Sequence, residues 1–469
     1  MEGIIGQPWE LREGRPQATM GGLEEKNGLN DSAHANKLDF SKDTEGQMEV
    51  PDKEAMPEYV GKGEWYHIGY HMTAAVASVP TLGLPFAVSL LGWGGGLVAL
   101  IAGGAVTMFT SFLVSSMLEY GGTRHIRFRD LAVAVFGKSG WWAVTPFQFA
   151  VCIGTTIANC IVGGQAIKAI DVLARGDTPV TLTEYIILFG GVNLLLAQCP
   201  NFHSIRFINQ TATFCTISFS LIAVAMSIYA GTTQNTEPDY SVPGDGVTKL
   251  FNVFNGLGIM AFAYGNTVIP EIGATAKAPA TRTMKYGIIM GYCTIVSAYL
   301  CVSITGYWAF GNGVTGIVLG SLTNPNWVVI MAWAFASVQL IGTTQVYCQP
   351  IYEFCDKTWG DILAPTWCLK NTVVRLVCRT IFICVCVLIG AMLPFFTDFM
   401  SLIGAIGFTP MDFVLPQFLW IAAYKPKGFG KWFSILVAVT YIFVGTMACI
   451  GAVRSIVLNA VNYSLFANL

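Results

Sequence analysis

The chain has 469 residues, of which 54% are hydrophobic and only 12% are charged, and its formal net charge at pH 7 is −2. Soluble domains carry roughly 25% charged residues, so this composition excludes an ordinary soluble domain. Apolar stretches of about 20 residues, enough to cross a hydrocarbon core ~30 Å thick, recur after residue 63. The sequence therefore predicts an all-α integral membrane protein.

The first 63 residues differ from the rest of the chain in composition. They contain thirteen acidic and seven basic residues and few aromatic ones. A segment of this kind does not bury enough apolar surface to fold on its own. We therefore expect a disordered acidic cytosolic tail over residues 1–63, followed by a helical domain over residues 64–469.

Eleven apolar segments follow this tail, and each is long enough for one membrane-spanning helix. We number them helix 1 to helix 11 and place them at residues 64–90, 92–118, 142–170, 183–199, 208–230, 250–274, 284–310, 327–352, 373–393, 398–421 and 432–458.

The distribution of Lys and Arg predicts the orientation, because these residues are enriched in cytosolic loops. With the N-terminus inside, 22 of the 26 Lys and Arg residues fall on the cytosolic side. The four that fall outside are Lys168, Arg175, Lys249 and Arg454. We therefore expect a cytosolic N-terminus and an extracellular C-terminus.

Helices 1 and 6 are interrupted by proline and glycine at the depth of the membrane core. The helix 1 break covers residues 78–85 and the helix 6 break covers residues 263–270. Proline lacks a backbone N–H, and lipid cannot satisfy the backbone groups that such a break frees. Helix 6 comes five spans after helix 1 and so runs in the opposite direction. This parity predicts two inverted repeats, residues 64–230 and 250–421, with an extra helix at 432–458.

Paired breaks of this kind are typical of the substrate sites of secondary transporters. Free N–H groups suit the carboxylate of an amino acid, and free carbonyl groups suit its ammonium. The break residues that we expect to bind substrate are Ser78, Val79, Pro80, Thr81, Ala263, Tyr264, Gly265 and Asn266. No acidic residue lies inside either break, so backbone carbonyls and hydroxyls are expected to hold the amine. The alternative is that the prolines and glycines only kink the helices.

Two carboxylates lie within predicted helices, where ionisable groups usually mark a path for ions or substrate. Asp412 lies past the middle of helix 10, and Glu271 follows Pro270 in helix 6. Both are candidates for binding a coupling proton. The alternative is that each pairs with a basic or backbone group and only locks the helices together.

Helices 3 and 8 carry polar residues near the predicted midplane. Thr155 and Asn159 share one face of helix 3, and Ser337 lies in helix 8. We expect them to line the substrate pocket. Polar residues at this depth also join helices to one another, which is the alternative interpretation.

The sequence shows no pattern typical of a metal site or a catalytic centre. His67 and His71 lie one helical turn apart but have no third ligand nearby, and no paired cysteine motif is present. No nucleophile, base and orienting group form a recognisable set. We therefore expect a protein that is not an enzyme and has no metal or cofactor. Transport is expected to use an ion gradient, with the proton gradient as the energy source, or to run downhill.

Seven stretches of the chain resemble the amino acid/auxin permease family, and most closely its plant-type GABA transporter subgroup. They are YHIGYHMTAAVASVPTLGLPF (66–86), LLGW (90–93), IRFRDLA (126–132), PNFHSIRFIN (200–209), YGNTVIPEIGAT (264–275), ITGYWAFG (304–311) and AMLPFFTDFMSLIGAIGFTPMDFVLP (391–416).

This resemblance implies an eleven-helix leucine-transporter-like fold that imports amino acids together with protons across the plasma membrane. It also implies a substrate site between the two breaks and the facing residues of helices 3 and 8. The expected partners are a small amino acid, the coupling proton and membrane lipid, without nucleic acid.

The leading hypothesis is a proton-coupled symporter that imports GABA or another small neutral amino acid by alternating access. One alternative is a broader permease for proline, betaine or several neutral amino acids. The other is a receptor that senses amino acids with the same fold.

Overall fold

The structure is a computed structural model, and it describes residues 61–176, 178–198, 205–233, 237–361, 368–393 and 396–460. The expected acidic tail lies outside the described residues except at its end. There Gly63 forms a parallel bridge with Ala276, and the Gly63 N–H lies 2.8 Å from the Thr275 carbonyl oxygen. Ordered structure therefore begins before the predicted start of helix 1.

The described residues are helical, with no strand longer than that bridge. The α-helices are α2 (Trp65–Val76), α3 (Leu84–Met117), α4 (Phe128–Phe136), α5 (Lys138–Arg175), α6 (Leu182–Ala197), α7 (Ile205–Thr233), α8 (Gly246–Ala263), α9 (Ile269–Thr275), α10 (Ala280–Phe310), α11 (Asn326–Trp359), α12 (Leu369–Met392), α13 (Phe396–Ile403), α14 (Leu415–Tyr424) and α15 (Phe429–Ala460). Short 3₁₀ segments are η1 (Val79–Gly83), η2 (Tyr120–Gly122), η3 (Gly311–Gly313) and η4 (Val318–Ser321), and η5 (Gly404–Val414) is a π-helix.

The eleven predicted spans are confirmed as candidate membrane crossings within the described residues. Among the described residues nine helical segments are long and apolar enough to span a membrane, and α6 is a shorter apolar helix. The segment 79–117 holds both the end of helix 1 and all of helix 2, because the chain bends at Gly92 without leaving helical hydrogen bonding. Gly92 has φ 72°, which glycine adopts without a steric penalty. Counting the two helices on either side of this bend separately, and adding α6, gives eleven candidate crossings.

Both predicted breaks are confirmed. In helix 1, α2 ends at Val76, η1 carries Pro80 near its start, and α3 carries Pro85 near its start. In helix 6, α8 ends at Ala263 and α9 begins at Ile269, so residues 264–268 are not helical. Prolines fit the first turn of a helix because those N–H groups have no intrahelical partner.

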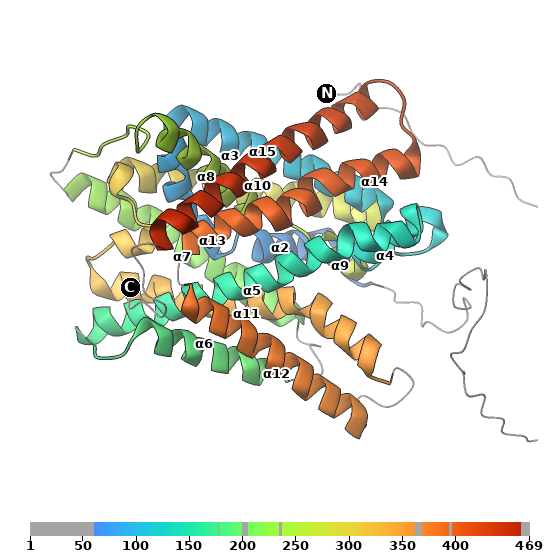
Figure 1. The fold of residues 1–469 in the computed structure, drawn as a ribbon, viewed down its shortest axis with the longest axis horizontal. Coiled ribbons are helices and arrows are strands. Elements are labelled where there is room, and N and C mark those ends of the chain that lie inside the picture. Colours follow the sequence, from blue (N-terminus) through green and yellow to red (C-terminus); the bar gives the residue numbers. More distant parts are fainter. Residues whose placement is uncertain are drawn as a thin grey trace, which may run out of the picture. The chain divides into compact units, whose positions relative to one another are not determined.

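The long helices pack in pairs that bring distant parts of the chain together. α5 lies along α11, α10 packs on α2 and α3, and α6 lies beside α12 (Figure 1). α8 packs against α3, α15 and the π-helix η5. Both breaks and η5 are therefore surrounded by protein, where irregular backbone at membrane depth is tolerated.

Helix 10 has an irregularity that the sequence did not predict. Its centre is the π-helix η5, which contains Pro410 and Asp412. The Thr409 hydroxyl donates to the Gly404 carbonyl at 2.7 Å, one residue farther back than an α-helical turn reaches. π-Helical turns occur frequently at functional sites. Here the wide turn lies next to the helix 6 break.

Candidate functional site

The side chain of Asp412 enters the helix 6 break. Its Oδ2 accepts a hydrogen bond of 2.9 Å from the backbone N–H of Asn266. Asp412 is 6% exposed and Asn266 is 3% exposed. Among the described residues no Lys, Arg or His side chain comes within ion-pair distance of Asp412. A buried carboxyl group thus has one backbone donor and no cationic partner there.

A chain of hydrogen bonds runs from Asn266 into α10 and α3. Asn266 Nδ2 donates to the Tyr292 hydroxyl at 3.3 Å, and that hydroxyl lies 3.0 Å from Ser111 Oγ. Ser111 Oγ donates to the Thr107 carbonyl at 2.7 Å. Since the Ser111 proton is used there, Tyr292 donates to Ser111. The helix 6 break is therefore tied to helices 2, 7 and 10.

Tyr299 joins the two breaks. Its hydroxyl lies 2.8 Å from the carbonyl oxygen of Val76, at the end of α2, and 2.5 Å from that of Ala263, at the end of α8. A tyrosine hydroxyl has a single proton, which these two carbonyls share. One buried donor therefore contacts the carbonyl ends of both first half-helices.

Tyr264 fixes the helix 6 break to helix 2. Its hydroxyl donates to the Leu100 carbonyl at 2.7 Å, and its ring lies against Gly103 and Gly104. The Tyr264 and Tyr299 rings pack together with centroids 5.0 Å apart. A Cβ at Gly103 would lie 3.0 Å from this ring, and a Cβ at Gly104 would lie 2.7 Å from Val296 and 3.2 Å from the Tyr264 hydroxyl.

The helix 1 break residues are closed off by packing. Ser78, Val79, Pro80 and Thr81 are all buried. The Ser78 N–H lies 2.7 Å from the Val76 carbonyl oxygen, so part of the break satisfies itself. Gln339 Nε2 on α11 donates to the Ala74 carbonyl at 3.4 Å, about half a helical turn before Val76.

The remaining predicted site residues bond to neighbouring helices or within their own. Asn159 Nδ2 donates to Thr344 Oγ1 at 3.1 Å, which joins helix 3 to helix 8. Ser337 Oγ donates to the Trp333 carbonyl of its own helix at 2.9 Å. Thr155 is buried, and its hydroxyl has no partner among the described residues. The helix-joining alternative therefore describes Asn159, whereas Thr155 retains an unused hydroxyl.

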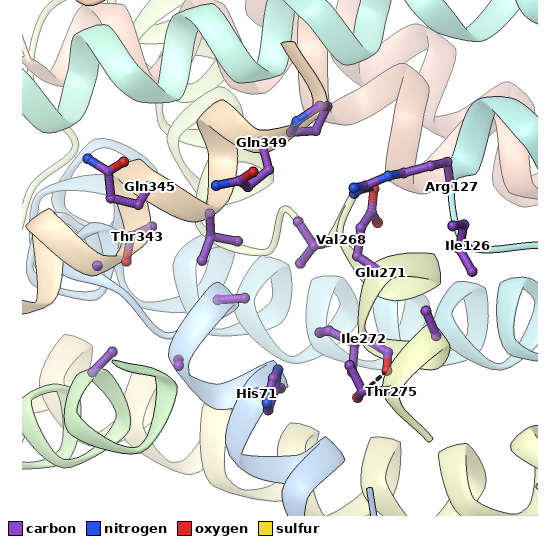
Figure 2. A pocket seen from close by; sticks show the side chains of 17 residues that line it. His71, Ile126, Arg127, Val268, Glu271, Ile272, Thr275, Thr343, Gln345 and Gln349 are labelled. Atoms are coloured by element: carbon purple, nitrogen blue, oxygen red, sulfur yellow. Dashed lines mark hydrogen bonds and ion pairs between the residues drawn. The ribbon is translucent and has the colours of Figure 1, made fainter. Parts of the chain in front are cut away.

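A cavity of about 370 Å³ lies between α2, α9 and α11. Figure 2 shows His71 on α2, Glu271 on α9, and Gln345 and Gln349 on the facing α11. This volume lies in the range of small-molecule sites. The lining includes Ala74 on α2 and Val268 at the end of the helix 6 break, among other residues, but none of the residues predicted to bind substrate.

Glu271 forms an ion pair at the edge of this cavity. Arg127 Nη1 lies 3.1 Å from Glu271 Oε1 (Figure 2). Arg127 Nε lies 2.6 Å from Glu353 Oε2 on α11. Lys357 adds a contact of 2.9 Å to Glu353. Although burial by itself lowers the pKa of Arg127, its two carboxylate neighbours hold it above the ordinary value. Glu271 therefore has the basic partner that the alternative interpretation names.

The candidate site also contains Tyr292, Tyr299 and Arg127, which are not among the residues predicted from the sequence. The two tyrosines are seven residues apart on α10, a spacing that places them on one helix face. This pattern was available in the sequence. Arg127 lies in the connection between predicted helices 2 and 3, and nothing local in the sequence predicts that it reaches two different helices.

The arrangement of the helices resembles that of two solved transporter structures. MhsT in complex with L-phenylalanine matches with a TM-score of 0.54 and 9% identity, over 84% of this chain and 99% of that one. A Na⁺-coupled sialic acid symporter in a substrate-bound outward-open state matches with a TM-score of 0.52 and 12% identity, over 87% and 92%. The fold is therefore the leucine-transporter-like fold of secondary transporters, with helices 1 and 6 broken.

Sequence comparison gives the family. The profile of the family described as "Transmembrane amino acid transporter protein" matches residues 61–458. The chain belongs to this family, which confirms the resemblance to amino acid/auxin permeases. GABA transporter 1 of Arabidopsis thaliana is 38% identical over 90% of this chain and 96% of its own length. Lysine histidine transporter-like 6 of Arabidopsis thaliana is 33% identical over 86% and 93%. The chain is an integral membrane transporter of amino acids and not an enzyme.

Proposed function

We propose that this transporter imports GABA or a related small neutral amino acid together with protons, by alternating access. It acts in the plasma membrane with its N-terminus in the cytosol and its C-terminus outside. The relative named as a GABA transporter supports the substrate class.

The observation that carries the proposal is the hydrogen bond from the Asn266 N–H to Asp412. Burying an unpaired carboxylate costs several kcal/mol, and a bound proton removes that cost. Asp412 is therefore the proton carrier. Because its partner is the backbone of the helix 6 break, gain or loss of the proton acts directly on the segment that contacts substrate.

The break geometry supports a zwitterionic substrate. The carbonyl ends of α2 and α8 suit an ammonium group, and in this structure Tyr299 occupies both. N–H groups at the starts of the second half-helices suit a carboxylate. Substrate would lie among Ser78, Thr81, Gly265 and Asn266 and leave through the 370 Å³ cavity toward the cytosol.

Glu271 has a different role in this proposal. Its ion pair with Arg127 neutralises it, so it has less need of a proton than Asp412. Arg127 also contacts Glu353 on helix 8. The pair therefore closes the cytosolic side by joining helix 6 to helix 8, and opening and closing of this pair accompanies substrate release.

The test is labelled uptake and current in a heterologous host, measured against pH, with and without sodium, for a panel of amino acids. Wild type should accumulate GABA or a close analogue faster as the outside becomes more acidic. Asp412→Asn should keep its surface expression and lose this acceleration, while Glu271→Gln should retain it. If Glu271→Gln loses the acceleration and Asp412→Asn retains it, Glu271 would be the proton carrier instead. Uptake by wild type that does not depend on pH would refute the proposal.

A broader permease is the second candidate, because four of the relatives are lysine histidine transporter-like proteins at 30–33% identity. A competition panel against labelled GABA distinguishes the two. Strong competition by proline, betaine or basic amino acids would favour the broader substrate range.

A further inference from the structure

A second, much smaller cavity adjoins Asp412. It is enclosed by α3, α10, the helix 6 break and helix 10, and has room for about one water molecule. Its polar lining consists of Asp412, Asn266, Tyr292, Ser111 and two threonines of α3. None of these residues lines the larger cavity.

The hydroxyl groups in the lining of this small cavity already donate their protons in hydrogen bonds within the protein. Thr107 donates to the carbonyls of Gly103 and Gly104, and Thr110 donates to the carbonyl of Val106. Ser111 donates to the Thr107 carbonyl, and Tyr292 donates to Ser111. Only the lone pairs of these hydroxyl oxygens remain for an occupant.

Two further acceptors in the lining are incompletely satisfied. Asn266 Oδ1 is buried and has no hydrogen-bond partner among the described residues. The Asp412 carboxylate accepts only the Asn266 N–H among the bonds of the described residues. The polar part of the lining therefore consists of oxygen acceptors around one carboxylate, and the rest is formed by Val114, Phe128, Ile269 and Pro416. An occupant that contacts the polar part must donate protons or carry positive charge.

We propose that this small cavity binds a single alkali metal cation through Asp412, Asn266 Oδ1 and the hydroxyl oxygens of Ser111 and Tyr292. Oxygen atoms are the ligands that hard cations prefer, and the carboxylate supplies the compensating negative charge. The lining has no basic side chain that would compete with the cation. A cation and a proton on Asp412 exclude each other, and this consequence alone rests on the proposed role of Asp412 in proton coupling.

The site has a functional consequence through its place in the fold. Its ligands come from helices 2, 7 and 10 and from the helix 6 break, so a bound cation holds these four elements together. The cation would therefore stabilise the conformation seen here, in which the break is tied to Asp412.

The test measures cation binding to the purified full-length protein, without any transport. Melting curves are recorded at one alkaline pH in sodium, lithium, potassium or choline chloride at equal ionic strength. At least one alkali cation should raise the melting temperature above that in choline, with a shift that saturates with concentration. The cation that gives the largest increase in melting temperature is the one that the site prefers. Binding of radioactive sodium to the purified protein checks the result obtained in sodium chloride.

Three variants make the test specific. Asp412→Asn should lose the cation-dependent shift, and Ser111→Ala should need a higher cation concentration for the same shift. Ser115→Ala is the matched control, because Ser115 is a buried serine one turn farther along α3 and outside the lining. An unchanged shift in both Asp412→Asn and Ser111→Ala, or no shift with any alkali cation in wild type, would leave water as the occupant and overturn the proposal. The melting temperature is measured without transport, so a failure of the proposed proton-coupled uptake would not change the result of this test.

Discussion

The hydroxyl of Tyr299 lies 2.8 Å from the carbonyl oxygen of Val76, at the point where helix 1 is interrupted. The same hydroxyl lies 2.5 Å from the Ala263 carbonyl, where helix 6 is interrupted. One buried side chain on helix 7 therefore connects the two half-helices next to the proposed substrate region. Movement of either half-helix must break or rearrange this shared bond.

Tyr299→Phe should destabilise the protein and reduce uptake. Removing the hydroxyl leaves a buried carbonyl without its donor, which costs about 1–3 kcal/mol. The melting temperature of the purified protein and labelled uptake measure the two effects. Tyr286→Phe is the control, because Tyr286 lies on the same helix and is 52% exposed. If the two variants behave alike, the bridge between the breaks has no energetic importance.

Gly265→Ala should abolish uptake while the protein still reaches the cell surface. A Cβ at this position would run into the ring of Phe408, which is itself packed against Phe262 and Tyr347. The helix 6 break cannot then keep its position beside η5. Gly191→Ala is the control, since a Cβ there meets open space. Normal uptake by Gly265→Ala would show that the break tolerates displacement.

The ion pair between Arg127 and Glu271 should show measurable coupling. Arg127→Glu and Glu271→Arg should each reduce stability and uptake, and the double variant should recover part of the loss. Partners in contact typically show an interaction energy of about 0.5–3 kcal/mol in such a cycle. Both side chains are 19% exposed, so solvent screens them only in part.

The control for this cycle is the pair Asp171 and Arg175, whose arginine side chain is 79% exposed. Exposed pairs contribute about 0–1 kcal/mol. Additive effects of the two Arg127 and Glu271 substitutions would mean that the pair does not hold the cytosolic side closed.

Ala75→Trp should block the larger cavity. Ala75 lies on its α2 wall, and an indole there occupies space through which substrate would pass. We expect uptake to fall to background with unchanged surface expression. Ala334→Trp on the exposed face of α11 adds the same bulk outside the cavity and should leave uptake near wild type. Full uptake by Ala75→Trp would place the substrate path elsewhere.

The contribution of Asp239 to stability, in the loop before α8, should depend on pH and be lost in acid. Hydrogen bonds from the Ser241 backbone N–H and hydroxyl, and from Asn312, lower the pKa of this carboxyl. Its contribution is therefore present above the unfolded pKa of about 3.9 and is lost as the pH falls through the lower folded value. Melting temperatures of wild type should drop more steeply below about pH 4 than those of Asp239→Asn. Parallel curves would contradict this assignment.

Local properties of the sequence were sufficient for most of the fold. Apolar length predicts each crossing, and proline with glycine predicts where helices 1 and 6 are interrupted. Both kinds of signal act within one or two helical turns, so they can be read from neighbouring residues. The short helix α4 and the π-helix η5 were not predicted, because α4 falls in the connection between predicted helices 2 and 3 and a wide turn has no clear local pattern.

Which carboxylate meets which partner was decided only by the tertiary structure. Asp412 and Asn266 are 146 residues apart, and Glu271 and Arg127 are 144 residues apart. The sequence placed both acids inside helices and left their roles equal. Packing separates them, because one carboxylate faces a broken backbone and the other faces an arginine. The sequence by itself determined a transporter-like membrane protein with two breaks, and the packing of helices distant in the chain decided how those breaks are held.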